Sequence, residues 1–143
     1  MRRIRLRLPD ASVEARLLED AAPRASERLW RALPLRVQLR SSRWSGETTF
    51  ASAPILSDPA DQASRVHVPR ENARTFMLPG HLYTGAFTGG IGLAYGEAQS
   101  RDVGLNTWTT DVAEFVGDSA AFLSALARVR RAGATDLLIE RVT

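Results

Sequence analysis

The chain has 143 residues, a size typical of one compact domain, and 44% of its residues are hydrophobic and 24% charged. These values exclude a disordered chain, a collagen-like fibre and a coiled coil. The net charge is +3, but residues 1–43 hold eleven arginines against five acidic residues, whereas residues 44–118 hold four against nine. We predict that Arg3, Arg5 and Arg7 lie on a solvated strand face. No nucleic-acid motif accompanies the arginines, so we expect no nucleic-acid partner.

Two residue types are missing from the sequence. It contains no cysteine, which excludes disulfides, thiolate nucleophiles and cysteine-ligated metals. It also contains no lysine, which excludes Schiff-base chemistry and the P-loop lysine. The use of arginine for all nineteen basic residues is typical of a GC-rich bacterial genome. The amino-terminal residues lack the apolar run of a signal peptide, and no apolar stretch is long enough to span a bilayer. We therefore expect a cytoplasmic protein that does not contact a membrane.

The first part of the chain changes from strand periodicity to helix periodicity and back. Apolar and polar residues alternate over residues 2–8 and 11–18 around a proline turn, which predicts a hairpin. Apolar residues at three- and four-residue spacing then predict a helix that Asp20 caps and Pro34 ends. Alternation over residues 35–40 predicts a third strand.

The rest of the chain combines short strands with one more helix. Residues 43–51 predict a glycine turn that leads into a strand, while residues 54–65 and 96–105 predict loops. Asp118 or Ser119 caps the second helix. Further strands are predicted at residues 74–78, 82–87, 91–95 and 106–115, and around residues 137–139. Many short strands and two helices predict a mainly β (α+β) fold, a small closed β-barrel with two capping helices, in a single domain over residues 1–143.

The segment RWSGE, residues 43–47, is the densest group of side chains that could bind a ligand. Arg43 can form paired hydrogen bonds with a carboxylate, the indole of Trp44 can stack, and Glu47 can act as a base. If these residues form a site, Trp44 and Glu47 border a cavity shared with Tyr83 or Tyr95. The equally weighted alternative is a turn in which Trp44 packs on the barrel end and Glu47 pairs with Arg43.

Two other patterns carry less weight. The glycines of residues 84–92 fit a hairpin better than a dinucleotide-binding loop, because strand and loop residues follow them instead of a helix. His67 and His81 are the only histidines, and no third ligand stands at metal-binding spacing, so we expect no metal. His81 is the more interesting of the two because it follows a Pro-Gly turn and precedes Tyr83.

Four segments, in chain order, resemble an uncharacterised bacterial family of cyclophilin-like fold. They are RWSGE, ENARTFMLPGHLYTG, GGIGLAYG and GLNTWTTDV, and the resemblance runs from about residue 3 to residue 142. It implies a small β-barrel with two capping helices. Cyclophilins proper are prolyl isomerases with a Phe-His-Arg motif and a Gln-Gly-Gly-Asp segment. This chain has Ser-Arg-Trp at the nearest position and lacks the second motif.

We therefore expect a cyclophilin-like protein that binds or transforms a small polar molecule in a pocket at the barrel wall or mouth. One alternative is a peptidyl-prolyl isomerase, in which an arginine would stabilise the twisted amide. The other is a non-catalytic binding module or subunit. The partner hypotheses are a small-molecule ligand and a second copy of the chain in a homodimer, with no cofactor. The candidate site residues are Glu47 and Arg43 as catalytic residues, and Trp44, His81, Tyr83, Tyr95, Asn106 and Trp108 as ligand-binding residues.

Overall fold

The structure is a computed structural model that describes residues 1–56, 69–85, 90–102, 105–106 and 108–143. The side chains of Arg43, Asp102, Leu105 and Asn106 also fall outside the description. Most of the loop predicted over residues 54–65, His67, and part of the glycine segment 84–92 therefore lie outside the described residues.

Short strands make up most of the described chain. Two α-helices are described, α1 (Pro23–Ala32) and α3 (Ala120–Ala132), with two short 3-10 helices, η1 (Arg43–Ser45) and η2 (Pro54–Leu56). The strands are β1 (Arg3–Arg7), β2 (Ser12–Leu17), β3 (Leu35–Ser41), β4 (Gly46–Ala51), β5 (Ala73–Arg74), β6 (Phe76–Met77), β7 (His81–Gly85), β8 (Ile91–Gln99), β9 (Arg101–Asp102), β10 (Leu105–Asn106), β11 (Thr109–Val116) and β12 (Ala134–Arg141).

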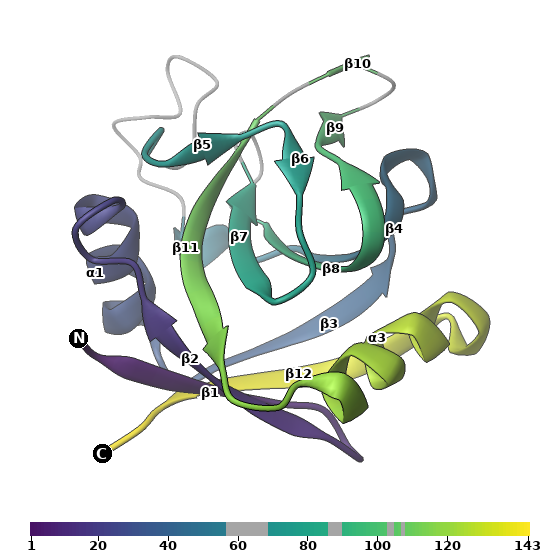
Figure 1. Ribbon diagram of the computed structural model, residues 1–143, viewed down its shortest axis with the longest axis horizontal. Helices are drawn as coiled ribbons and strands as arrows, with labels where there is room; N and C mark the ends of the chain where they lie inside the picture. Colours follow the sequence, from purple (N-terminus) through teal and green to yellow (C-terminus); the bar gives the residue numbers. More distant parts are fainter. Residues whose placement is uncertain (57–68, 86–89, 103–104, 107) are drawn as a thin grey trace.

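One antiparallel sheet closes into a ring of strands (Figure 1). Its order is β2-β1-β12-β3-β4-β8-β7-β11, and β11 pairs back with β2. The short strands β5 and β6 pair with β11 and β8, and β9 and β10 form a separate hairpin. The prediction of a mainly β protein with two helices is confirmed for the described part of the chain.

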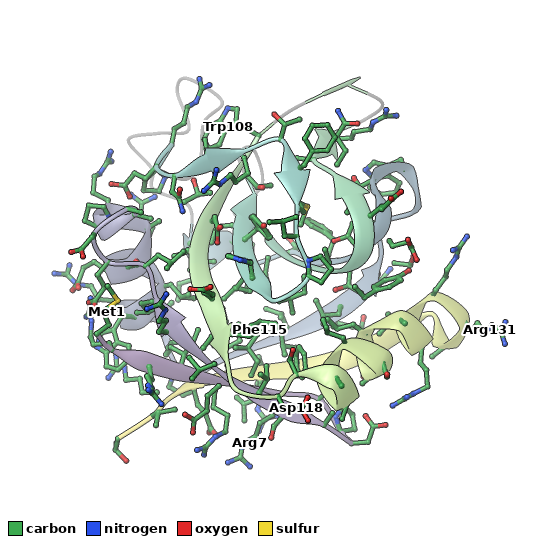
Figure 2. All side chains as sticks on the ribbon, in the orientation of Figure 1. Met1, Arg7, Trp108, Phe115, Asp118 and Arg131 are labelled. Atoms are coloured by element: carbon green, nitrogen blue, oxygen red, sulfur yellow. The ribbon has the colours of Figure 1, made fainter. Side chains whose placement is uncertain are left out.

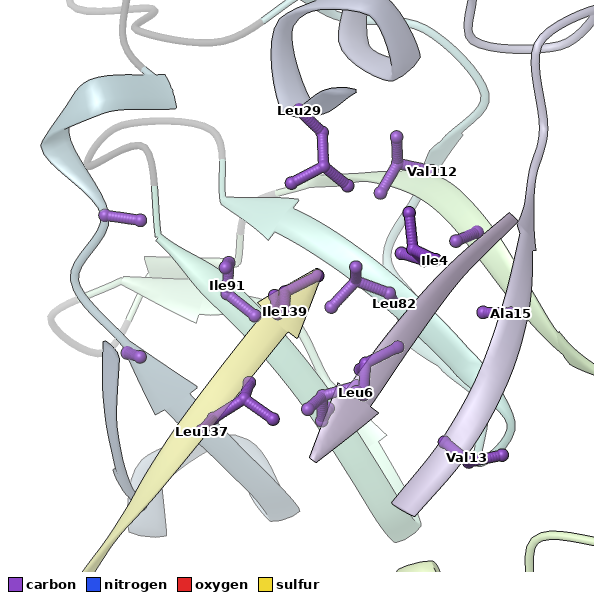
Figure 3. Packing of buried hydrophobic residues seen from close by; sticks show 14 of the residues in the cluster. Ile4, Leu6, Val13, Ala15, Leu29, Leu82, Ile91, Val112, Leu137 and Ile139 are labelled. Atoms are coloured by element: carbon purple, nitrogen blue, oxygen red, sulfur yellow. The ribbon is translucent and has the colours of Figure 1, made fainter. Parts of the chain in front are cut away.

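Period-two alternation places the core inside this ring. Ile4 and Leu6 on β1 and Ile139 on β12 are fully buried, and they lie in one cluster with Leu29 of α1 (Figure 3). Leu126 of α3 belongs to the same cluster. Burying one such side chain stabilises the fold by about 1.5–3 kcal/mol. Both helices therefore contribute their apolar faces to the core inside the ring.

The arginines of β1 lie on the outside of the ring, as the alternation predicts. Arg5 donates a hydrogen bond from Nη2 to Glu14 Oε1 at 2.8 Å, and Arg7 Nε lies 2.7 Å from Glu140 Oε1. Hydrogen bonding from Arg5 lowers the pKa of Glu14. Arg3 also faces solvent, 3.6 Å from Glu14. Water screens these pairs, so their main effect is to keep this face of the sheet hydrated.

The start of α1 differs from its prediction. The helix begins at Pro23 with Ala22 as its N-cap, so Asp20 is not the capping residue. The carboxylate of Glu71 instead accepts hydrogen bonds from the backbone N–H groups of Ala25, at 2.8 Å, and Arg24, at 3.3 Å. The first N–H groups of a helix have no partner within it, and a negative charge there also favours the helix dipole. A residue 46 positions along the chain thus supplies the cap.

The loop predicted over residues 96–105 is also partly wrong. Strand β8 continues to Gln99, because Ala98 pairs with Gly46 of β4 on one side and with Met77 of β6 on the other. The β9–β10 hairpin follows directly. Backbone partners on both sides therefore outweigh the polar composition of this segment.

The second helix agrees better with its prediction, since the Asp118 carboxylate accepts a hydrogen bond from the Ala120 N–H at 3.0 Å.

We predict that Glu71→Ala lowers the free energy of unfolding by about 1 kcal/mol, because it removes the acceptor of two helix N–H groups. Asp20→Ala, at the position that local sequence favours for the cap, should change it by less than about 0.5 kcal/mol. Urea denaturation of both variants measures the difference. A larger loss in Asp20→Ala would contradict the role of Glu71.

Candidate functional site

A groove of about 1010 Å³ lies on the outside of the ring, where the start of β4, the short strand β6 and the second half of β8 meet. Leu82 of β7 and Leu93 of β8 point into the core, so the residues beside them, Tyr83 and Ala94, point outward beneath the segment that carries β6. The groove is lined by Trp44, Ser45, Gly46, Glu47, Phe76, Met77, Leu78, Pro79, Gly96, Glu97, Ala98, Gln99 and Arg101.

Exposed apolar side chains are concentrated in this groove. Among the described residues, large hydrophobic side chains are exposed at Met1, Trp44, Ile55, Phe76 and Leu78. Three of these line the groove, where Trp44 is 58% exposed, Phe76 69% and Leu78 58%. Isolated exposed apolar residues are ordinary, but a contiguous group around a concave surface is typical of a binding site.

The wall formed by residues 76–79 is held in place from below. Met77, Tyr83, Ala94 and Ala98 form a small buried cluster apart from the main core. The Tyr83 hydroxyl accepts a hydrogen bond from the backbone N–H of Leu78 at 2.8 Å. Burial raises the pKa of Tyr83 to about 12, so the phenol stays protonated at neutral pH. Tyr83 thus anchors the groove wall and is not among the residues that line the groove.

An irregularity in strand pairing places the Glu47 carboxylate. Gly46 pairs with Ala98 and Thr48 with Ala94, so Glu47 alone faces the three residues between those partners on β8. Glu47 Oε1 accepts a hydrogen bond from the Glu97 N–H at 3.2 Å. A Cβ atom added to Gly96 would lie 2.6 Å from the Glu47 carboxyl carbon, so the carboxylate rests on a bare stretch of backbone. Bulges commonly redirect a side chain in this way.

The structure brings two of the predicted site residues together in the groove, Trp44 and Glu47. Tyr83 lies beneath it, and Tyr95 packs against the main core with a buried hydroxyl for which the described residues provide no hydrogen-bond partner. Trp108 lies apart from the groove, near β5 (Figure 2). The guanidinium carbon of Arg70 is 5.2 Å from its ring centroid. The side chains of Arg43 and Asn106 lie outside the description.

His81 belongs to a second arrangement, on β7 and β11. Its Nδ1 lies 3.0 Å from Oδ1 and 2.9 Å from Oδ2 of Asp111, whose side chain is only 4% exposed. The hydrogen bond with Asp111 raises the pKa of His81, and burial opposes that rise. The register of β11 against β7 shifts between Asp111 and Ala113, which aims the aspartate toward the histidine. A carboxylate that orients a histidine is a common proton-transfer pair.

Several candidate functional residues are not predicted from the sequence. Strand β11 contains two acidic residues, Asp111 and Glu114, and nothing in the local sequence marks Asp111 as the one that pairs with a histidine. Phe76, Met77 and Leu78 form an apolar run, whereas a half-buried strand alternates apolar and polar residues. At least one apolar side chain of this run must therefore face outward, and this is the signal for a binding surface. Glu97 and Arg101 carry no local signal.

A comparison with models of protein families matches residues 4–138 to proteins of unknown function, DUF3830. The chain belongs to this family. No curated protein matches its sequence.

Two solved structures resemble this DUF3830 protein closely in fold. The solution structure of a hypothetical protein from Archaeoglobus fulgidus has a TM-score of 0.68 and 17% identity, over 99% of this chain and 95% of that one. The structure of McbB in complex with tryptophan has a TM-score of 0.72 and 17% identity, over 98% of this chain and 46% of McbB. The chain thus spans about half the length of McbB, and identities this low show a shared fold alone.

No helix in the described part of this DUF3830 protein combines the length and the apolar character needed to cross a membrane. Within the same residues, no three or more His, Asp or Glu side chains are grouped so that they could hold a metal ion.

We predict that the His81–Asp111 pair makes stability depend on pH. The folded pKa of His81 lies above its ordinary value of 6.5, so the stabilisation is fully present below pH 6.5 and is lost as the pH rises through the folded pKa. Asp111→Asn should lower the folded pKa of His81 and flatten this dependence. An NMR titration, with His67→Gln to assign the second histidine, measures the pKa. An unchanged His81 pKa in Asp111→Asn would contradict the pairing.

We predict opposite outcomes for alanine at two glycines of the groove. Gly46 has φ +100°, and an added Cβ would lie 2.5 Å from the Glu97 carbonyl oxygen, so Gly46→Ala should cost about 1–3 kcal/mol of stability. At Gly96 the three atoms nearest the new Cβ all belong to the flexible end of Glu47, so Gly96→Ala should cost less than about 1 kcal/mol while it displaces the carboxylate. Urea denaturation compares the two, and a larger loss in Gly96→Ala would contradict this reading.

Proposed function

We propose that this protein binds a small molecule with a flat apolar part in the groove formed by β4, β6 and β8. The ring of strands is taken to be a cyclophilin-like barrel with α1 and α3 as its caps. This assignment is supported by the closed antiparallel order and by the four segments that resemble an uncharacterised family of cyclophilin-like fold. The ligand would then bind on the outer wall of that barrel.

The observation that carries the proposal is the exposure of Trp44, Phe76 and Leu78 around one concavity. Removing apolar area from water is favourable by about 25 cal/mol per Å², and a ligand that covers these side chains gains part of that free energy on binding. The groove also has the composition of a ligand site, with apolar walls and a few polar groups at defined positions. Its volume of about 1010 Å³ is ample for a small molecule.

Glu47 is the polar group to which we assign a direct role. Its carboxylate is held at the rim by the Glu97 N–H, and from there it can accept a hydrogen bond or a proton from the ligand. The apolar part of the ligand would lie against Trp44 and Phe76. The tryptophan in the McbB complex, bound by a protein of similar fold, makes a flat aromatic ligand a reasonable first choice for a probe.

We predict that indole, a flat and uncharged probe, shifts backbone NMR signals of residues 44–47 and 76–79. Stacking on one aromatic ring contributes about 0.5–1.5 kcal/mol, so Trp44→Ala and Phe76→Ala should each weaken indole binding by about two- to twelvefold. Ile55→Ala is the matched control, because Ile55 is 62% exposed but lies outside the groove.

An indole affinity that is equal in Trp44→Ala, Phe76→Ala and the unsubstituted protein would contradict the proposal. So would an equal loss in Ile55→Ala, since binding would then not be specific to the groove. Circular dichroism of each variant confirms that the fold is retained before the affinities are compared.

A further inference from the structure

We propose that the ligand is an organic cation, a flat aromatic ring that carries a protonated amino group on a short chain. This inference rests on the proposed function, since it specifies the ligand of the same groove. The ring would lie on the apolar wall, and the amino group would lie between the carboxylates at the rim.

The charge of the groove differs in sign from that of the protein. The chain as a whole carries +3. The charged side chains described along the groove are two carboxylates, Glu47 and Glu97, and one guanidinium, Arg101. The groove is thus an acidic site on a basic protein, and the complementary ligand is a cation.

The glutamates of the groove differ from the five glutamates of this chain that form described salt bridges. Glu14, Glu19, Glu27, Glu114 and Glu140 each lie within salt-bridge distance of an arginine. For Glu47 the described contact is the backbone N–H of Glu97, which leaves its negative charge in place. Among the described side chains, no arginine forms a salt bridge with Glu47 or Glu97. In a chain with nineteen basic residues, two groove carboxylates without a described arginine partner can bind a cation from outside.

The tryptophans show the same contrast. Trp30 has the guanidinium carbons of Arg2 and Arg141 at 4.9 and 5.0 Å from its ring, and Trp108 has Arg70 at 5.2 Å. For Trp44, which is 58% exposed, the described residues include no such arginine. A cation above an indole face is favourable, more so when water is partly removed. An indole and a carboxylate that share one groove are therefore suited to a ring bearing an amine.

The experiment compares three probes with the same ring: indole, tryptamine and indole-3-propionic acid. At neutral pH their charges are zero, positive and negative, respectively. Because the ring is the same in all three, differences in affinity measure the effect of the probe's charge and not of stacking. Backbone NMR titration of the full chain at low salt should show tryptamine binding about three- to tenfold more tightly than indole. Indole-3-propionic acid should bind more weakly than indole, because the two carboxylates of the groove outnumber its one guanidinium.

Glu47→Gln and Glu97→Gln test which groups select the cation. Each should reduce the preference for tryptamine over indole by about threefold, because that ratio reports the amino group and the ring contacts are common to both probes. Glu140→Gln is the matched control, since Glu140 pairs with Arg7 outside the groove. Glutamine keeps an oxygen that can accept the Glu97 N–H, so the bulge should survive the Glu47 substitution.

The outcomes separate the two proposals. If indole does not bind, the proposed function itself fails. If indole binds in the groove but tryptamine binds no better, or indole-3-propionic acid binds best, the groove stands and the cation is ruled out. A tryptamine preference that persists in both glutamine variants also rules out recognition by these carboxylates.

Discussion

The pairing of β11 with β2 is the constraint on which the rest of this structure depends. Because β11 pairs with β7 as well, it closes the sheet into a ring in which each main strand has two neighbours. Closure divides every strand into an inward and an outward set of side chains. The inward set, with the helices, fills the interior with apolar atoms such as those of Leu6, Leu82 and Ile139. Polar and charged side chains that could take part in binding or catalysis therefore lie on the outer wall of the ring or at its two ends.

On the outer wall, acidic side chains are redirected where the ladder is irregular. One irregularity, between β4 and β8, aims Glu47 over Gly96, and another, between β7 and β11, aims Asp111 at His81. A regular ladder would place each of these side chains at its pleat position, whereas a bulge changes its direction and its neighbours. Tyr83 connects the two places, because its hydroxyl holds the groove wall at Leu78 and its ring lies 6.1 Å from that of His81.

The sequence predicts those features of the fold that depend on residues close together in the chain. Alternation predicted the first hairpin and its outward arginines, because the side-chain period of a strand follows from its backbone alone. It could not predict that Glu71 caps α1, since that contact requires two distant segments to meet. For the same reason it ended β8 too early, before the partners on β4 and β6 were known. Of the predicted site residues, Trp44 and Glu47 meet because they are neighbours in one turn, whereas Phe76 and Glu97 join them only through the sheet.

The groove illustrates how a fold can hold apolar groups in water without losing their arrangement. Trp44, Phe76 and Leu78 gain little from burial, so other contacts must position them. The backbone of Leu78 is tied to Tyr83, Met77 beside it is only 6% exposed, and the pairing of Gly46 with Ala98 holds the strand that follows Trp44. The backbone of the wall is thus ordered before any ligand arrives. A ligand that binds there then pays mainly for its own loss of freedom, which is how a preorganised surface gains affinity from few contacts.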